Sequence, residues 1–169
     1  LGGTQDNALA KVLDQVLQLA ASRFPASRVF DLLQQAPVAA RFGLGAAELE
    51  TIHAWMRAAG VRWGLDGASV GRLGGWGAEG ADVIDPPPAH TLEEGLHRLF
   101  LAWAAGTAAQ HTAFAGRIGA AAPEGQAALA LGSFWRYVDS LRVLHAQLQR
   151  PHTGAAWRAL LNDILERLV

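Results

Sequence analysis

Apolar residues recur every three or four positions along most of the chain, which is the spacing of one face of an α-helix. This period predicts helical segments over residues 6–21, 22–35, 37–43, 46–60, 91–106, 126–150 and 153–169. No stretch alternates apolar and polar residues as a half-buried strand would. The pattern therefore predicts a single all-α domain over residues 1–169, built as a bundle of about five main helices with short extra turns.

Each of the longer segments carries an apolar stripe that we expect to face the core. The stripes are Leu9, Val12, Leu13, Val16 and Ala20; Val29, Leu32 and Leu33; Leu49, Ile52, Met56 and Ala59; Leu92, Leu96, Leu99, Phe100 and Trp103; Leu131, Phe134, Val138, Leu141 and Leu148; and Trp157, Leu161, Ile164 and Leu168.

Residues that favour helix ends stand at the borders of these segments. Pro25 and Pro37 suit helix starts, and Thr91 followed by Glu94 predicts a capping box. Glu94 and Arg98 have the spacing of an ion pair on the solvent side of the same helix. The predicted helix ends are marked by Gly43, Gly60, Gly106 and Pro151, and Thr153 is expected to cap the last helix.

Two stretches break the helical period. Residues 67–90 are rich in glycine and contain three consecutive prolines, which predicts a long surface connection. Trp76 lies inside it, and we expect this side chain to pack back onto the helices because a fully exposed tryptophan would leave a large apolar area in water. Residues 107–125 form the second irregular stretch.

The composition limits the possible partners. Hydrophobic residues make up 51% of the 169 residues and charged residues 17%, but no apolar run approaches the roughly 18 residues of a membrane span. A net charge of −1 argues against a free-standing, strongly basic nucleic-acid binder. There is no cysteine, no recognisable signal peptide and no initial methionine. We expect a cytoplasmic piece of a longer protein that does not enter a membrane.

The candidate cofactor and metal motifs are incomplete. The glycine-rich stretch GRLGGWGAEG lacks the lysine and the following Ser or Thr of a P-loop. His90 and His97 are seven residues apart, so only Glu93 and His97 could share a helix face, and a zinc site needs three protein ligands. Asp82 and Asp85 stand beside three prolines without a partner motif. The sequence predicts no cofactor, no metal site and no catalytic residue.

Two other candidate functions, a catalytic histidine and a DNA-reading helix, are disfavoured by the residues around them. His53 lies on an otherwise apolar helix, and we interpret it as a partly buried structural histidine rather than a catalytic base. Residues 27–59 have the spacing of a helix-turn-helix, but Glu48 and Glu50 would place two acids near the start of the reading helix, where they would repel phosphates.

Four blocks of residues occur in an order that resembles the RecC family, the gamma subunit of bacterial exodeoxyribonuclease V. The matching residues are Ser22, Arg23 and Phe24; Arg41, Phe42 and Gly43; Trp55 with Gly60, Val61, Arg62, Trp63, Gly64, Leu65 and Asp66; and His90, Thr91, Gly95, Leu96, Arg98 and Leu99. The resemblance covers residues 22–103. Leu92 replaces the tryptophan that follows the His-Thr pair in that family, and the preceding linker is richer in glycine and proline.

The resemblance implies a non-catalytic role. RecC-like subunits join RecB-like and RecD-like motor subunits in a helicase–nuclease that processes broken duplex ends for recombinational repair. They resemble helicases without ATPase motifs, split the duplex and help to inspect the emerging strand. This chain is similar to the helical insertion subdomain of such an inactive helicase-like subunit. ATP and Mg²⁺ are implied only for the partner subunits.

The segment from Gly60 to Asp66 is the most distinctive of these blocks, and we interpret it mainly as an architectural corner. Gly60 permits a left-handed exit from the helix, and Trp63, followed by Gly64, fills the joint between helices. Arg62 or Asp66 anchors the loop by a charge-assisted bond. A direct DNA contact by Arg62 is the alternative. For the whole chain, the alternative is a helical protein–protein interaction module with no DNA role.

Overall fold

The computed structural model describes residues 7–67, 89–121, 123–125 and 127–169, and it confirms the all-α prediction. Over these residues the chain forms helices and no strand, apart from isolated bridges that join Pro25 to Trp63 and Phe114 to Arg117. The helices are α1 (Ala8–Ala20), α2 (Ala26–Leu33), α3 (Ala36–Arg41), α4 (Ala46–Ala58), α6 (Leu92–Ala105), α7 (Ala108–His111), α8 (Ala127–Leu148) and α9 (Gly154–Leu168).

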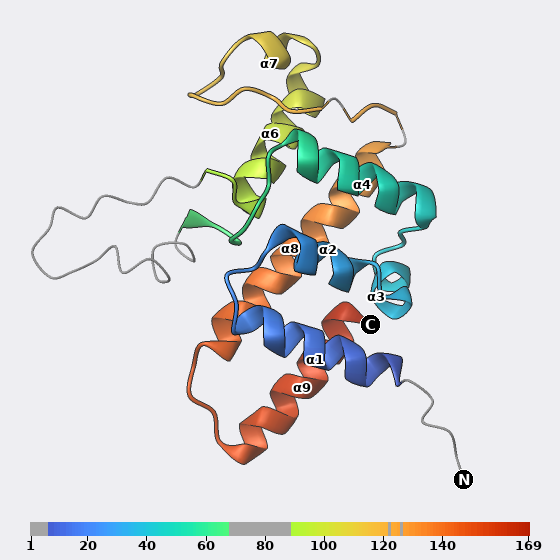
Figure 1. Cartoon of the computed structure of the whole chain (residues 1–169), viewed down its shortest axis with the longest axis vertical. Coiled ribbons are helices and arrows are strands. Elements are labelled where there is room, and N and C mark those ends of the chain that lie inside the picture. The colour runs from blue at the N-terminus through green and yellow to red at the C-terminus, as the bar shows by residue number, and fades with distance from the viewer. Residues whose placement is uncertain (1–6, 68–88, 122, 126) are drawn as a thin grey trace, which may run out of the picture.

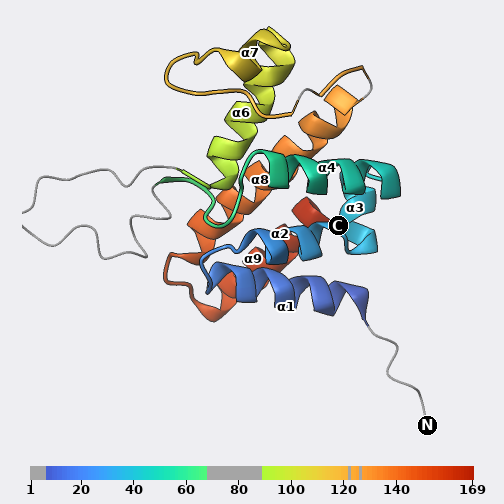
Figure 2. The same cartoon turned by 45° about the horizontal axis from the view of Figure 1, so that its top comes forward.

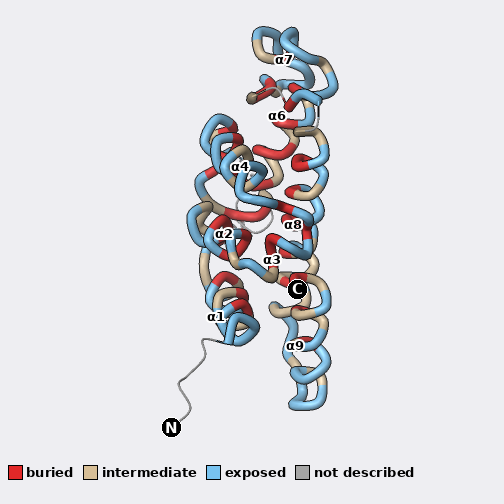
Figure 3. Tube along the Cα trace, turned by 90° about the vertical axis from the view of Figure 1, so that its right-hand side faces the viewer, coloured by how far each residue is buried: buried red, intermediate tan, exposed pale blue. Residues whose placement is uncertain are grey.

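The helices lie in two layers. Figure 3 shows α1, α2 and α4 on one side and α6, α8 and α9 on the other. The long helix α8 runs through the second layer and contacts α4, α6 and α9 (Figures 1 and 2). The short helix α7 lies at one end of the molecule and packs on α6 (Figure 1). None of the helices that the structure describes combines the length and apolar character required to span a bilayer.

Most helix ends lie within one or two residues of the positions that the sequence predicts. Thr91 Oγ1 accepts a hydrogen bond from Glu94 N at 3.2 Å, and Thr153 Oγ1 accepts one from Ala156 N at 3.3 Å. These bonds satisfy backbone donors that a helix start leaves without a partner. Beyond the ends of α4 and α6, Gly60 and Gly106 adopt the positive φ angles that glycine tolerates best.

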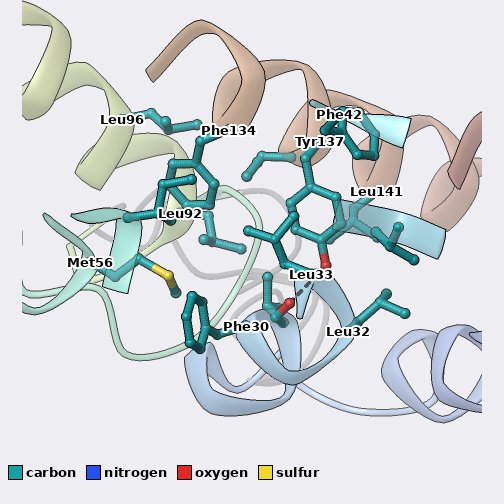
Figure 4. Packing of buried hydrophobic residues seen from close by; sticks show 14 of the residues in the cluster. Phe30, Leu32, Leu33, Phe42, Met56, Leu92, Leu96, Phe134, Tyr137 and Leu141 are labelled. Carbon is teal, nitrogen blue, oxygen red and sulfur yellow. Dashed lines mark hydrogen bonds between the residues drawn. The ribbon is translucent and has the colours of Figure 1, made fainter. Parts of the chain in front are cut away.

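The core lies between the two layers and consists mainly of leucine, valine and phenylalanine. In Figure 4, Phe134 and Tyr137 of α8 point toward Leu33 of α2 and Leu92 of α6. Tyr137 is fully buried, and its hydroxyl donates a hydrogen bond of 2.7 Å to the carbonyl of Val29. This bond satisfies a phenol that would otherwise be buried without a partner, and it links α8 to α2.

Several predicted core positions are in fact exposed. Leu9, Phe100, Trp103 and Trp157 keep 41%, 47%, 47% and 39% of their surface in contact with water. In α6, the side that bears Leu92, Leu96 and Leu99 faces the other helices, and Phe100 and Trp103 extend the apolar stripe past the covered side. The prediction was wrong at these positions because periodicity gives the direction of an apolar stripe but not how much of it the neighbours cover.

Three local predictions need correction. Glu94 pairs with Arg117 at 2.9 Å instead of Arg98. Residues 107–125 are not irregular throughout, since they include α7. His53 is exposed rather than partly buried, although its ring stacks on Phe30 with centroids 4.6 Å apart. Trp76 and most of the predicted 67–90 connection lie outside the described residues.

Candidate functional site

The segment Gly60–Asp66, which we call the corner, begins by closing the end of α4. Gly60 has a φ angle of +69°, and its N–H donates to the carbonyl of Arg57 at 3.0 Å. The N–H of Val61 donates to the carbonyl of Met56 at 2.9 Å. This pair of bonds is a Schellman motif, which requires a left-handed residue at the position of Gly60.

The corner then supplies acceptors to the starts of two other helices. The carbonyls of Gly64 and Leu65 accept from the first two N–H groups of α6, those of Leu92 and Glu93, at 3.0 and 2.9 Å. The carbonyl of Arg62 accepts from Ala26 N, the first residue of α2, at 2.9 Å. Since helix starts leave their N–H groups unpaired, these backbone bonds of the corner join α2 and α6 to the end of α4.

N–H groups of the corner also donate hydrogen bonds to carbonyls of neighbouring segments. Arg62 N and Trp63 N both donate to the carbonyl of His90, at 2.9 and 3.3 Å, and Gly64 N lies within hydrogen-bond distance of the carbonyls of Arg23 and Phe24. Gly64 is buried with a φ angle of +80°. An alanine there would be strained in the left-handed region, so this position requires glycine.

A second glycine allows α6 to lie against the corner. A Cβ atom built on Gly95 would overlap Cγ2 of Val61. Val61 and Leu65 are buried, and they form the apolar underside of the corner. The helix α6 therefore packs directly on the turn that precedes it in the sequence, and only glycine at position 95 permits this approach.

The corner is tied to α8 by charge. Arg142 of α8 contacts Asp66 at 3.4 Å and Glu93 of α6 at 3.5 Å. The two carboxylates keep 18% and 29% of their side-chain surface exposed, and the arginine keeps 42%, so solvent screens the pairs and each contributes on the order of 0.2–1 kcal/mol. Of the two anchors that the sequence suggests, Asp66 forms the ion pair.

Two side chains satisfy carbonyls that the end of α4 leaves open. Arg98 Nη1 donates to the carbonyl of Ala59 at 2.9 Å, and its Nε donates to the carbonyl of Ile118 at the same distance. His90 Nδ1 lies 2.9 Å from the carbonyl of Gly60. Arg98 therefore links the end of α4, just before the corner, to the segment that follows α7.

Arg62 and Trp63 are the corner residues whose side chains could contact a partner. Arg62 is exposed, and its guanidinium has no hydrogen bond or ion pair to any residue that the structure describes. Trp63 is only partly buried, and its backbone forms the isolated bridge with Pro25. Arg23 is exposed in the turn that follows α1. Two exposed arginines therefore belong to segments that are joined by a backbone hydrogen bond, Gly64 N to the carbonyl of Arg23.

Comparison with known proteins identifies the family. The family described as "RecBCD enzyme subunit RecC fourth domain" matches residues 6–169. The chain belongs to the RecC family. The resemblance predicted from residues 22–103 is confirmed, and the match extends to the helices on both sides of that region.

Three relatives of this RecC-family chain carry the name "RecBCD enzyme subunit RecC". The protein of Mycobacterium tuberculosis H37Rv is 41% identical over 71 residues, which cover 42% of this chain. The protein of Mycolicibacterium smegmatis is 48% identical over 62 residues (37% of this chain), and that of Escherichia coli K12 is 29% identical over 100 residues (59%). The matched stretches span only 6% to 8% of the length of these relatives.

Sequence reasoning identified the corner but missed most of its partners. Gly95 and Arg98 are among the residues that resemble the RecC family. The sequence alone did not predict that Gly95 packs on Val61 or that Arg98 bonds the end of α4. No sequence motif pointed to Arg142, because α8 is far from the corner in the sequence and approaches it only in the folded chain. Among the described residues, no group of three or more His, Asp and Glu side chains is placed to hold a metal ion.

Proposed function

We propose that this chain is a non-catalytic, helical part of a RecC-like subunit in the helicase–nuclease exodeoxyribonuclease V (RecBCD), which processes double-strand DNA ends for recombinational repair. The family match over residues 6–169 carries the proposal. The corner supports a structural role, because its backbone N–H and C=O groups join α2, α4 and α6. Helicase, exonuclease and hydrolase activities, with their ATP and Mg²⁺, belong in this proposal to RecB-like and RecD-like partners in the cytoplasm.

The second part of the proposal is a DNA contact at the outer edge of the corner. Arg62 and Arg23 are both exposed; Arg62 precedes the partly buried Trp63, and the carbonyl of Arg23 accepts a hydrogen bond from Gly64 N, the residue after Trp63. Arginine binds phosphate oxygens with two parallel hydrogen bonds, and an exposed aromatic ring offers a surface on which a base stacks. With a net charge of −1, the whole chain provides little long-range attraction, so the contact is local and weak without the rest of the complex.

Fluorescence anisotropy with labelled single-stranded and forked DNA tests this contact. We expect a dissociation constant of roughly 10⁻⁴ to 10⁻⁶ M at low salt, weakening as salt rises. Arg62→Ala should weaken binding and reduce the magnitude of the salt slope by about 1. Arg158→Ala is the matched control, because it removes the same charge from an exposed position on α9.

The outcomes separate the two parts of the proposal. Equal loss for Arg62→Ala and Arg158→Ala would mean that binding follows total charge, and the corner contact would be wrong. No binding at low salt would leave the chain as scaffold and favour the alternative, a helical protein–protein interaction module. The exposed aromatic residues of α6 and α8 are the observation that supports this alternative.

A further inference from the structure

Three aromatic side chains form an exposed cluster on the outer side of α6 and α8. Phe100, Trp103 and Trp135, which we call the aromatic patch, are 47%, 47% and 37% exposed. The ring centroids of Phe100 lie 5.0 Å from those of Trp103 and 5.8 Å from those of Trp135. Large aromatic residues gathered on a surface are typical of interaction sites, because each leaves a large apolar area in water.

The aromatic patch adjoins a small pocket whose lining includes charged side chains. The pocket is lined by Glu93, Leu96, Trp135, Val138, Asp139 and Arg142. The helices α6 and α8 run side by side and antiparallel here (Figures 1 and 2). Trp135 belongs to both the pocket and the patch, so the two adjoin, and we call them together the groove. From Glu93 to Trp103 the groove extends along ten residues of α6, which is about 15 Å.

The pocket end of the groove carries an excess of negative charge. Arg142 is shared between Asp66 and Glu93. Asp139 is exposed and forms no ion pair with any residue in the described part of the chain. Glu93 and Asp139 line the pocket together with Arg142, so carboxylates outnumber guanidinium groups among its lining residues, whereas the patch end is apolar.

We propose that this groove binds a segment of another protein chain that carries an arginine or lysine beside apolar side chains. The aliphatic stem of the basic residue would lie along the exposed ring of Trp135, and its cation would reach the carboxylate of Asp139. The apolar side chains next to this basic residue in the partner segment would cover Phe100 and Trp103. The excess of carboxylates would repel phosphates, so the charge favours a basic protein segment over nucleic acid.

Nuclear magnetic resonance of the purified chain, with ¹⁵N in its tryptophan side chains, provides the test. The probe is a short synthetic helical peptide that carries two leucines and one arginine on one face, with the arginine about two turns away from the leucines. The control peptide has citrulline in place of arginine, which keeps the shape and removes the charge. We expect the arginine peptide to shift the indole signals of Trp103 and Trp135 and to bind more tightly than the citrulline peptide.

Variants then assign the two ends of the groove. Asp139→Asn should reduce the affinity for the arginine peptide about two- to fivefold, as for a partly exposed ion pair, and leave the citrulline peptide unchanged. Trp103→Ala should weaken both peptides about tenfold or more. Leu129→Ala is the matched control, because it removes a 75% exposed apolar side chain from α8 outside the groove and should change neither affinity.

Several results would overturn the proposal. They are equal binding of the two peptides, no shift of Trp103 or Trp135, and tighter binding of single-stranded oligothymidine than of the arginine peptide to the same indoles. A dimer of this chain in light scattering that Trp103→Ala dissociates would replace the basic segment by a second copy. The proposal does not depend on the DNA contact at Arg62, since neither peptide experiment contains DNA.

Discussion

Gly95 is the residue at which α6 crosses the corner, and its missing side chain determines how closely the two approach. Gly95→Ala would force Val61 or the helix to move, because the added methyl group overlaps Cγ2 of Val61. We expect a loss of about 1–3 kcal/mol of unfolding free energy, the usual range for overpacking a core. This loss of unfolding free energy is measured by urea denaturation with circular dichroism as the readout.

Gly132 provides the matched control for this substitution. It lies inside α8, and a Cβ atom built there meets nothing within 4 Å. Gly132→Ala should therefore stabilise the chain by about 0.5–1 kcal/mol through helix propensity. If both alanine variants were more stable than the natural chain, the close approach at Val61 would not be a constraint.

Tyr137 couples stability to pH. Its burial raises the pKa of the phenol well above its ordinary value of 10.0. In the unfolded chain the phenol loses its proton above pH 10, whereas the folded chain keeps it, so stability falls as pH rises beyond 10, by up to about 1.4 kcal/mol per pH unit.

The variant Tyr137→Phe isolates this effect. At neutral pH it should be less stable by about 0.5–1.5 kcal/mol, because the hydrogen bond to Val29 is lost. Phenylalanine does not titrate, so the advantage of the natural chain should shrink above pH 10. Urea denaturation of the two chains at neutral pH and near pH 11 measures the stability difference and its change with pH. A difference that stays constant between the two pH values would contradict the buried neutral phenol.

At the scale of elements, the corner is a junction in which backbone bonds provide most of the connections and Trp63 adds apolar contact. Trp63→Ala should lower the unfolding free energy by about 2 kcal/mol, less than the 3–5 of a fully buried aromatic residue, because this ring is only partly buried. Thermal and urea unfolding measure the change.

Trp157 serves as the comparison, since it is 39% exposed on α9 and lies outside the corner. Trp157→Ala should lower the unfolding free energy by less than about 1 kcal/mol. Equal effects of the two variants would show that Trp63 has no special place in the junction, and the architectural interpretation of the corner would have to rest on its backbone bonds alone.

The helices and their ends could be predicted from the sequence because local chemistry determines them. Thr91, Gly60 and Thr153 act within one turn of the chain, so their roles follow from neighbouring residues. The exposure of Phe100 and Trp103 could not be predicted, because it depends on which helix lies opposite. The ion pairs of Arg142 were missed for the same reason: they join residues far apart in the sequence.

At the scale of the whole molecule, stability is concentrated where α8 passes between its neighbours. Phe134, Tyr137 and Leu141 are buried against helices of both layers (Figure 4). The segment that contains α7 has a different setting. It packs on α6, and only Ala109 of its four helical residues is buried.

This difference predicts the order in which backbone amides exchange with solvent. Amides of the central part of α8 should exchange through global unfolding, and those of Ala108–His111 should exchange earlier through local opening. Hydrogen–deuterium exchange at residue resolution measures both sets. Arg98→Met should accelerate exchange around Ile118, because that arginine ties the carbonyl of Ile118 to α6. Equal protection of α7 and α8 would mean that the chain opens as one unit, and that the segment after α6 is as firmly attached as the core.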